Sequence, residues 1–117
     1  MPSRVLVAKE LAELFKLFSH PDRIRLVEEL RGGEQVVSFL GERLDLPGTR
    51  VSQHLSLLRA HRIVEERREG RHVYYHLTNP DLAEWITDAL GFIEARMKGD
   101  SQNRRALHQA RRLWTGQ

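Results

Sequence analysis

The chain contains no cysteine, which excludes a disulfide framework and thiolate chemistry. It has no apolar run of about 18 residues, so the sequence predicts no membrane span. A glycine-rich phosphate loop, a nucleophile in a recognisable setting and a metal-activated water site are also missing, and we therefore expect no enzyme, no catalytic residue and no cofactor. Lysine and glutamate interrupt residues 1–15, where no small-residue cleavage site occurs; this pattern predicts a cytoplasmic protein without a secretory signal.

Basic residues are concentrated in two blocks of the chain. The 117 residues suffice for one domain with a modest core, and the formal net charge is +3. Residues 47–76 carry six arginines against three glutamates, and residues 96–117 carry six basic residues against one acid. Residues 77–95, in contrast, hold four acids and neither lysine nor arginine. This distribution suits a polyanionic partner better than the total charge suggests.

The spacing of apolar and polar side chains over residues 47–60 predicts a short helix with two contrasting faces. Pro47 is favourable at a helix N-terminus, and Val51, Leu55 and Leu58 recur at steps of four and three as an apolar stripe. A second face combines hydroxyl and amide side chains with almost no charge: Thr49, Ser52, Gln53 and Ser56. Such groups can read base edges in DNA, whereas a solvated face usually holds lysine and glutamate. The alternative is a face of small residues packed on another helix.

Two β-type runs, 63–68 and 72–77, follow and predict a hairpin whose turn contains Gly70, since glycine tolerates a positive φ. Three arginines cluster near the tip, where the alternative is a solvated loop with random charges. Because this cluster directly follows a candidate recognition helix, its position favours a role in contacting DNA phosphates or the minor groove. The residues that we expect to contact double-stranded DNA are Thr49, Arg50, Ser52, Gln53, His54, Ser56, Arg59, Arg67, Arg68, Arg71 and His72.

The rest of the chain predicts a helical framework around these two elements. Helical spacing and turn signals indicate further helices near residues 5–18, 21–30, 36–44 and 80–98. Residues 101–114 predict either a last basic helix or a partly disordered segment. We therefore expect one DNA-binding and dimerisation domain over residues 1–98 and a basic tail or helix over residues 99–117.

The first helix and the helix near 80–98 are richer in apolar residues than a small core can cover. Pairing them across a twofold axis would bury these residues, so we expect a homodimer. The residues that we expect at its interface are Leu11, Leu14, Phe15, Leu82, Trp85, Ile86, Ala89, Leu90 and Ile93. Two recognition helices would then enter successive major grooves, about 34 Å apart, on a palindromic operator.

Three segments, in this order and at this spacing, resemble the ArsR/SmtB family of winged helix-turn-helix transcriptional repressors: FKLFSHPDRIRLVEEL (15–30), LPGTRVSQHLSLLRAHRIV (46–64) and RREGRHVYYHL (67–77). The resemblance implies a mainly α fold with a β-hairpin wing. It also implies a homodimer that binds an operator upstream of the genes it represses. Gly48 departs from the family, in which a polar side chain is common at this position, so one potential DNA contact is missing.

Two metal sites known in the family are absent from this chain. One uses cysteines on the third helix, where Val36 and Ser38 stand here. The other uses Asp-x-His and His-x-x-His on the C-terminal helix, and the matching positions are Asn79, Asp81, Phe92 and Ala95. Only Asp81 among them offers a ligand. We therefore assign no metal-binding residue, and the effector remains unknown.

The local spacing of the six histidines predicts no metal site that could replace the two absent ones. His54 and His61 would lie about 10 Å apart on a helix, and His72 and His76 about 13 Å apart on a strand, too far to share one ion. The other two stand alone in the sequence: His20 and His108. Two alternatives to the repressor stay open, a metal sensor with a non-standard histidine and carboxylate site and a winged-helix module for protein interactions.

Overall fold

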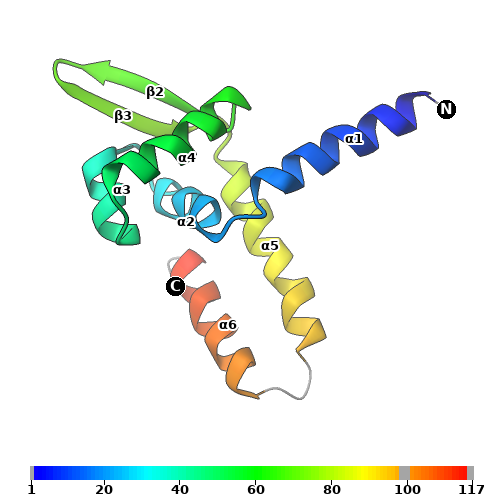
Figure 1. Cartoon of the computed structure of the whole chain (residues 1–117). Coiled ribbons are helices and arrows are strands. Elements are labelled where there is room, and N and C mark those ends of the chain that lie inside the picture. The colour runs from blue at the N-terminus through cyan, green and yellow to red at the C-terminus, as the bar shows by residue number, and fades with distance from the viewer. Residues whose placement is uncertain (1, 98–100, 116–117) are drawn as a thin grey trace. The chain divides into compact units, whose positions relative to one another are not determined.

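A computed structural model describes residues 2–97 and 101–115 of the chain, which divides into two compact units, Met1–Asn79 and Pro80–Gln117. The first unit contains α1 (Pro2–Leu17), α2 (Pro21–Leu30), β1 (Gln35–Val36), α3 (Val37–Leu44), α4 (Gly48–Ala60), β2 (Val64–Glu69) and β3 (His72–Leu77) (Figure 1). The second contains α5 (Asp81–Arg96) and α6 (Ser101–Thr115). No described helix combines the length and the apolar character needed to cross a membrane.

The core of the first unit lies between three helices and the hairpin. Side chains from α2, α3 and α4 are fully buried there: Leu26, Val27, Leu40, Val51, Leu55 and Leu58. Val64 and Leu77, which are cross-strand partners on β2 and β3, are 1% and 5% exposed and close the core on the sheet side. The predicted apolar stripe of α4 and the predicted fold, mainly α with a β-hairpin wing, are both confirmed.

Helix α2 begins with a cap that involves a histidine. Pro21 occupies the first turn, where its missing N–H leaves no hydrogen bond unmade. Nδ1 of His20 accepts the backbone N–H of Asp22 at 3.1 Å and so satisfies one of the free donors at the helix start. The carboxylate of Asp22 in the first turn is favourable because the helix dipole is positive at this end.

The connection between α3 and α4 is a tight turn that sets the direction of α4. Asp45 ends α3 in the left-handed region, at φ 56°, and the N–H of Leu46 donates to the carbonyl of Gly41 at 3.0 Å. A Cβ on Gly41 would lie 3.0 Å from the carbonyl oxygen of Leu46. Glycine is therefore favoured at this position of α3, because a side chain would have to push away the backbone of the turn.

Gly41→Ala is expected to lower the free energy of unfolding by about 1–2 kcal/mol relative to Gly48→Ala, because a close-packed turn does not accommodate an extra methyl group. At Gly48, where the turn meets α4, the atom nearest to an added Cβ would be Cγ1 of Val37, at 3.9 Å, which is an ordinary van der Waals contact. Urea unfolding of the two variants measures the difference. Equal free energies of unfolding would show that the turn is not tightly packed around Gly41.

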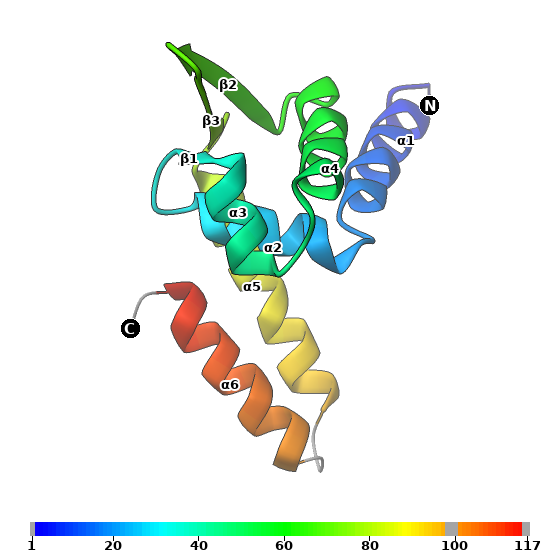
Figure 2. The same ribbon diagram turned by 60° about the vertical axis from the view of Figure 1, so that its left-hand side comes forward.

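The sheet of the first unit has the order β1-β3-β2, with antiparallel neighbours. Glu69 and His72 are the last partners of the hairpin, and Gly70 turns the chain at φ +61°. The hairpin projects beyond α3 and α4 (Figure 2). The prediction that the third helix begins at Val36 is wrong by one residue, because Gln35 and Val36 form β1 and pair with Tyr75 and Tyr74.

The second unit is a pair of helices in the described residues. Glu94 of α5 accepts two hydrogen bonds from Nη1 of Arg111 on α6, at 3.2 and 3.0 Å. Residues 101–115 form a helix, which is the first of the two alternatives predicted for residues 101–114, a last basic helix or a partly disordered segment. The residues 98–100, which lie at the predicted boundary between domain and tail, are outside the described residues.

Candidate nucleic-acid interface

Helix α4 buries its apolar stripe and exposes the polar face opposite to it. Six of the seven residues of α4 that we predicted at the DNA are exposed: Thr49, Arg50, Ser52, Gln53, Ser56 and Arg59. The face of hydroxyl and amide groups is therefore open, and within the described chain it does not pack on another helix. Its main donors and acceptors are available to a partner with polar edges.

The wing presents its arginines beside this face. Arg68 and Arg71 are exposed, as are Arg67 and His72. Among the described residues, neither Arg71 on the wing nor Arg50 on α4 forms an ion pair or a side-chain hydrogen bond. Of the five arginines that we predicted at the DNA, these two guanidinium groups are thus the most available for an external anion.

Glu66 connects the wing to the end of α4. Its Oε1 lies 3.3 Å from Nη1 of Arg59 and 3.7 Å from Nε of Arg68. The hydroxyl of Tyr75, the cross-strand partner of Glu66, donates to Oε2 at 3.3 Å. Burial, followed by the charge of Glu66 and this hydrogen bond, raises the pKa of Tyr75 above its ordinary value, so the phenol stays protonated as the donor.

The role of Glu66 was not predicted from the sequence, although one signal was present. Residues two apart on a strand share a face, so Glu66 and Arg68 were bound to be neighbours on β2. The contact with Arg59 required knowledge of how α4 meets the hairpin. Glu66 offsets part of the positive charge of both arginines, which are consequently less available than Arg50 and Arg71.

Two carboxylates hold the side chain of Arg67 on the wing. Its Nη2 and Nε donate to Glu34 at 2.6 and 3.1 Å, and its Nη1 donates to Glu69 at 2.7 Å. The guanidinium also lies 4.6 Å from the centre of the Tyr74 ring. The hydrogen bond from Arg67 lowers the pKa of Glu34, and those from Arg67 to both carboxylates raise the pKa of Arg67 itself. Arg67 therefore braces the hairpin against the segment before β1.

His54 differs from the other predicted contacts of α4 because its side chain turns inward. The side chain is only 12% exposed, and its ring lies against the ring of His20 with centroids 4.6 Å apart. Its Nε2 is 3.7 Å from Oδ2 of Asp22. The expectation that His20 stands alone is wrong, because folding brings the start of α2 against α4. His54 is accordingly less accessible to DNA than its neighbours.

Both helices that we expect at a dimer interface carry exposed apolar side chains. On α1, Leu11 is 46% and Phe15 is 54% exposed, and on α5 the exposed fraction of Trp85 is 40%. The other residues predicted there are half-buried, except for the exposed Ala89: Leu14, Leu82, Ile86, Leu90 and Ile93. Further apolar exposure that was not predicted occurs at Val5, Leu6, Val7 and Phe92. These surfaces are of the kind that a second chain covers.

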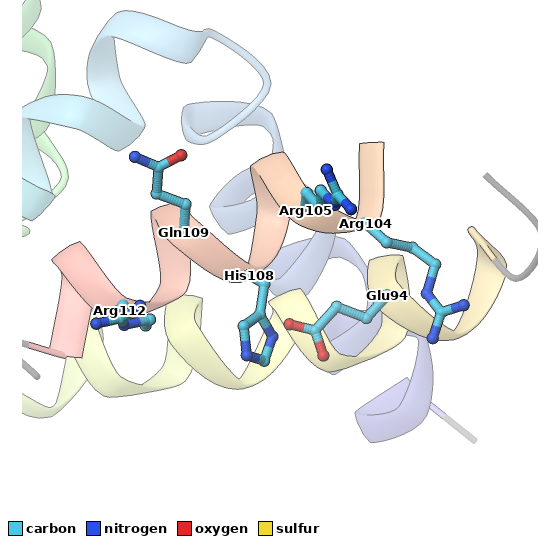
Figure 3. Close-up of a pocket in the computed structure, with 6 residues that line it drawn as sticks. All are labelled: Glu94, Arg104, Arg105, His108, Gln109 and Arg112. Carbon is cyan, nitrogen blue, oxygen red and sulfur yellow. The ribbon is translucent and has the colours of Figure 1, made fainter. Parts of the chain in front are cut away.

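The second unit has a basic hollow of about 740 Å³ between α5 and α6 (Figure 3). Its lining residues are Glu94 from α5 and, from α6, Arg104, Arg105, His108, Gln109 and Arg112. The arginines are exposed to solvent, and by themselves they define no ligand site. The hollow adds positive charge to the chain outside the first unit.

Comparison with known proteins relates the chain to transcriptional regulators. The model of a family described as a helix-turn-helix domain matches residues 18–67, which include α2, α3, α4 and the start of the wing. The HTH-type transcriptional regulator KmtR of Mycobacterium tuberculosis is 31% identical over 96 residues, which are 82% of this chain and 74% of KmtR.

Two solved structures share the fold over most of their length. The crystal structure of the transcriptional repressor BigR from Xylella fastidiosa has a TM-score of 0.65 and 33% identity, covering 86% of this chain and 98% of that chain. The second is the solution structure of Mb0332 from Mycobacterium bovis, a homodimeric winged helix-turn-helix DNA-binding domain described as a possible ArsR-family regulator. It has a TM-score of 0.66 and 25% identity, covering 83% of this chain and 88% of that one.

Proposed function

The chain belongs to the ArsR/SmtB family of winged helix-turn-helix transcriptional regulators, and we propose that it represses transcription as a homodimer bound to a palindromic operator. Proteins of this family bind DNA and are not enzymes.

The observation that carries the proposal is the exposed neutral face of α4 beside a wing whose Arg71 forms no ion pair with any described residue. We assign base reading to Gln53 and Ser52, because an amide and a hydroxyl can each donate to and accept from base edges in the major groove. Thr49 and Ser56 complete this face along the groove. The buried stripe on the opposite side fixes the rotation of α4, so these side chains face outward together.

Phosphate contacts are assigned to Arg50 and Arg71, with weaker contributions from Arg59, Arg68 and His72. The basis is their exposure and the absence of a paired carboxylate at the first two among the described residues. Arg67 is assigned a supporting role instead, since three short hydrogen bonds to Glu34 and Glu69 already occupy its guanidinium. Phosphate contacts fix the register of the protein, whereas base contacts supply the specificity.

A homodimer is supported by the uncovered apolar residues of α1 and α5. The relative from Mycobacterium bovis is a homodimer with the same fold. A twofold axis would place two copies of α4 in successive major grooves, about 34 Å apart, and an inverted repeat follows from that symmetry. We infer that an effector would act at a place other than the family's cysteine and C-terminal metal sites, because this chain lacks the ligands of both sites.

Gln53→Ala is expected to relax base preference at one position of each half-site, with a loss of discrimination of about 1–3 kcal/mol. The physical reason is the loss of a pair of hydrogen bonds to one base, while phosphate contacts are kept. Fluorescence anisotropy with the operator and with each single-base variant measures this loss. If the variant bound all sequences more weakly by the same factor, Gln53 would not be a base-reading residue.

Ser38→Ala is a suitable control for this series. Ser38 is an exposed hydroxyl on α3, outside the face of α4 that we propose enters the groove. The variant should keep both affinity and base preference. If the control variant lost affinity only for certain DNA sequences, this result would show that α3 takes part in base reading.

A further inference from the structure

Three potential metal ligands from two separate segments meet in the first unit. His20 and Asp22 lie at the start of α2, and His54 lies in the middle of α4. One ligand atom from each of the three residues lies within 4.8 Å of the other two. Oδ2 of Asp22 is 3.8 Å from Nδ1 of His20 and 3.7 Å from Nε2 of His54. The cluster is distinct from the family's sites, which would fall on α3 and α5.

We propose that His20, Asp22 and His54 bind one divalent transition-metal ion. Two imidazoles and one carboxylate suit zinc, cobalt, nickel or copper and not magnesium or calcium, which prefer oxygen ligands. Bonds of about 2.0–2.1 Å in a tetrahedral site place ligand atoms about 3.3 Å apart. The two separations from Asp22 exceed this value by about half an ångström, and the ligand atoms of His20 and His54 lie within 4.8 Å of each other. Rotation of the two imidazole side chains toward Asp22 would close the site around an ion. Water would supply the open coordination position.

The state of His54 favours this assignment. Among the described residues, its Nε2 is buried without a hydrogen-bond partner, and a buried polar atom of this kind is costly unless a partner is supplied. Burial, together with the positive charges of His20 and Arg23, lowers the pKa of His54, while the carboxylate of Asp22 acts in the opposite direction. The ring is therefore neutral near pH 7, the form in which histidine binds metals.

His20 links the site to the start of α2. Its Nδ1 already accepts the N–H of Asp22, so binding through this nitrogen would take the acceptor away from the helix cap. The ring can also bind through its other nitrogen after rotation. Either way the ion joins the first turn of α2 to α4. If the proposed function holds, it joins the frame of the helix-turn-helix to the helix that reads DNA.

The test uses the metal-free full-length chain, without a histidine tag and without DNA, titrated with Co²⁺. Visible ligand-field bands should show one ion per chain, and Zn²⁺ should displace it. The substitutions His54→Gln and Asp22→Asn should each weaken Co²⁺ binding by at least about 100-fold, since even loss of a supporting outer-shell group costs 10–100-fold. His108→Gln is the matched control and should bind like the parent chain, because His108 lies in the second unit.

A measurement on the unsubstituted chain guards against variants that fail to fold. Nitrogen-15 spectra of the six imidazoles should show that Zn²⁺ shifts the signals of His20 and His54. The signals of the other four should stay in place: His61, His72, His76 and His108. No binding, binding that survives His54→Gln, or shifts confined to other histidines would overturn the proposal. Because no DNA is present, this outcome is independent of whether the chain binds an operator.

Discussion

Replacing Leu11 by glutamate is expected to dissociate the proposed dimer and to weaken operator binding by about 10²–10⁴-fold. Leu11 is 46% exposed on α1, where we place the partner chain, and a carboxylate buried in an apolar interface is strongly unfavourable. Two linked recognition helices gain about 10²–10⁴ in affinity over one, because the second binds at a high effective concentration. A monomer loses that gain even if each α4 is intact.

Light scattering gives the mass of the Leu11→Glu variant, and fluorescence anisotropy gives its affinity for the operator. Lys9→Glu is the matched control, because Lys9 is exposed on the same helix at a position pointing away from the apolar side. The control should stay dimeric and should lose only the small effect of a changed surface charge. A Leu11→Glu variant that remains dimeric and binds normally would place the interface elsewhere.

Removing Arg50 and Arg71 together is expected to flatten the salt dependence of DNA binding more than any other pair of substitutions. A dimer would lose four phosphate contacts, and the slope of log affinity against log salt should fall by about 3.6, at about 0.9 per contact. At about 0.1 M salt this corresponds to a loss of roughly 10³-fold in affinity. The loss should be similar on specific and non-specific DNA, because phosphates carry no sequence information.

The control for this variant removes a charge pair instead of a free charge. Arg67→Ala combined with Glu34→Ala leaves the net charge unchanged and eliminates a guanidinium that is already hydrogen-bonded. Its salt slope should match that of the parent chain, although the wing loses a brace. If the control flattens the slope as much as Arg50→Ala with Arg71→Ala does, Arg67 is a phosphate contact and its assignment as a brace is wrong.

Features encoded by neighbouring residues were predictable from the sequence. The stripe of Val51, Leu55 and Leu58 repeats at helical spacing, and the buried face of α4 follows from it. Gly70 between two β-type runs predicted the hairpin, and the structure places this glycine at a positive φ in that turn. The resemblance to a family then connected these elements into a winged helix-turn-helix, which the fold confirms.

Features that depend on tertiary packing were not predictable. Strand β1 has only two residues and exists because β3 lies beside it. Arg67 meets Glu34 across 33 positions of sequence, and His20 meets His54 only because α2 packs on α4. Spacing within one helix or strand could exclude metal binding by two histidines of that element. It contained no information on two histidines that come from different elements.

In the proposed complex, two copies of the α4 face and its wing read an inverted repeat. Selection of bound sequences from a random double-stranded DNA library, with the purified chain at moderate salt, tests it most directly. We expect enrichment of an inverted repeat whose half-site centres lie about one helical turn, roughly 10–10.5 base pairs, apart. With Gln53→Ala, one preferred base per half-site should be lost. Recovery of a single asymmetric half-site, or of no preferred sequence at all, would contradict it.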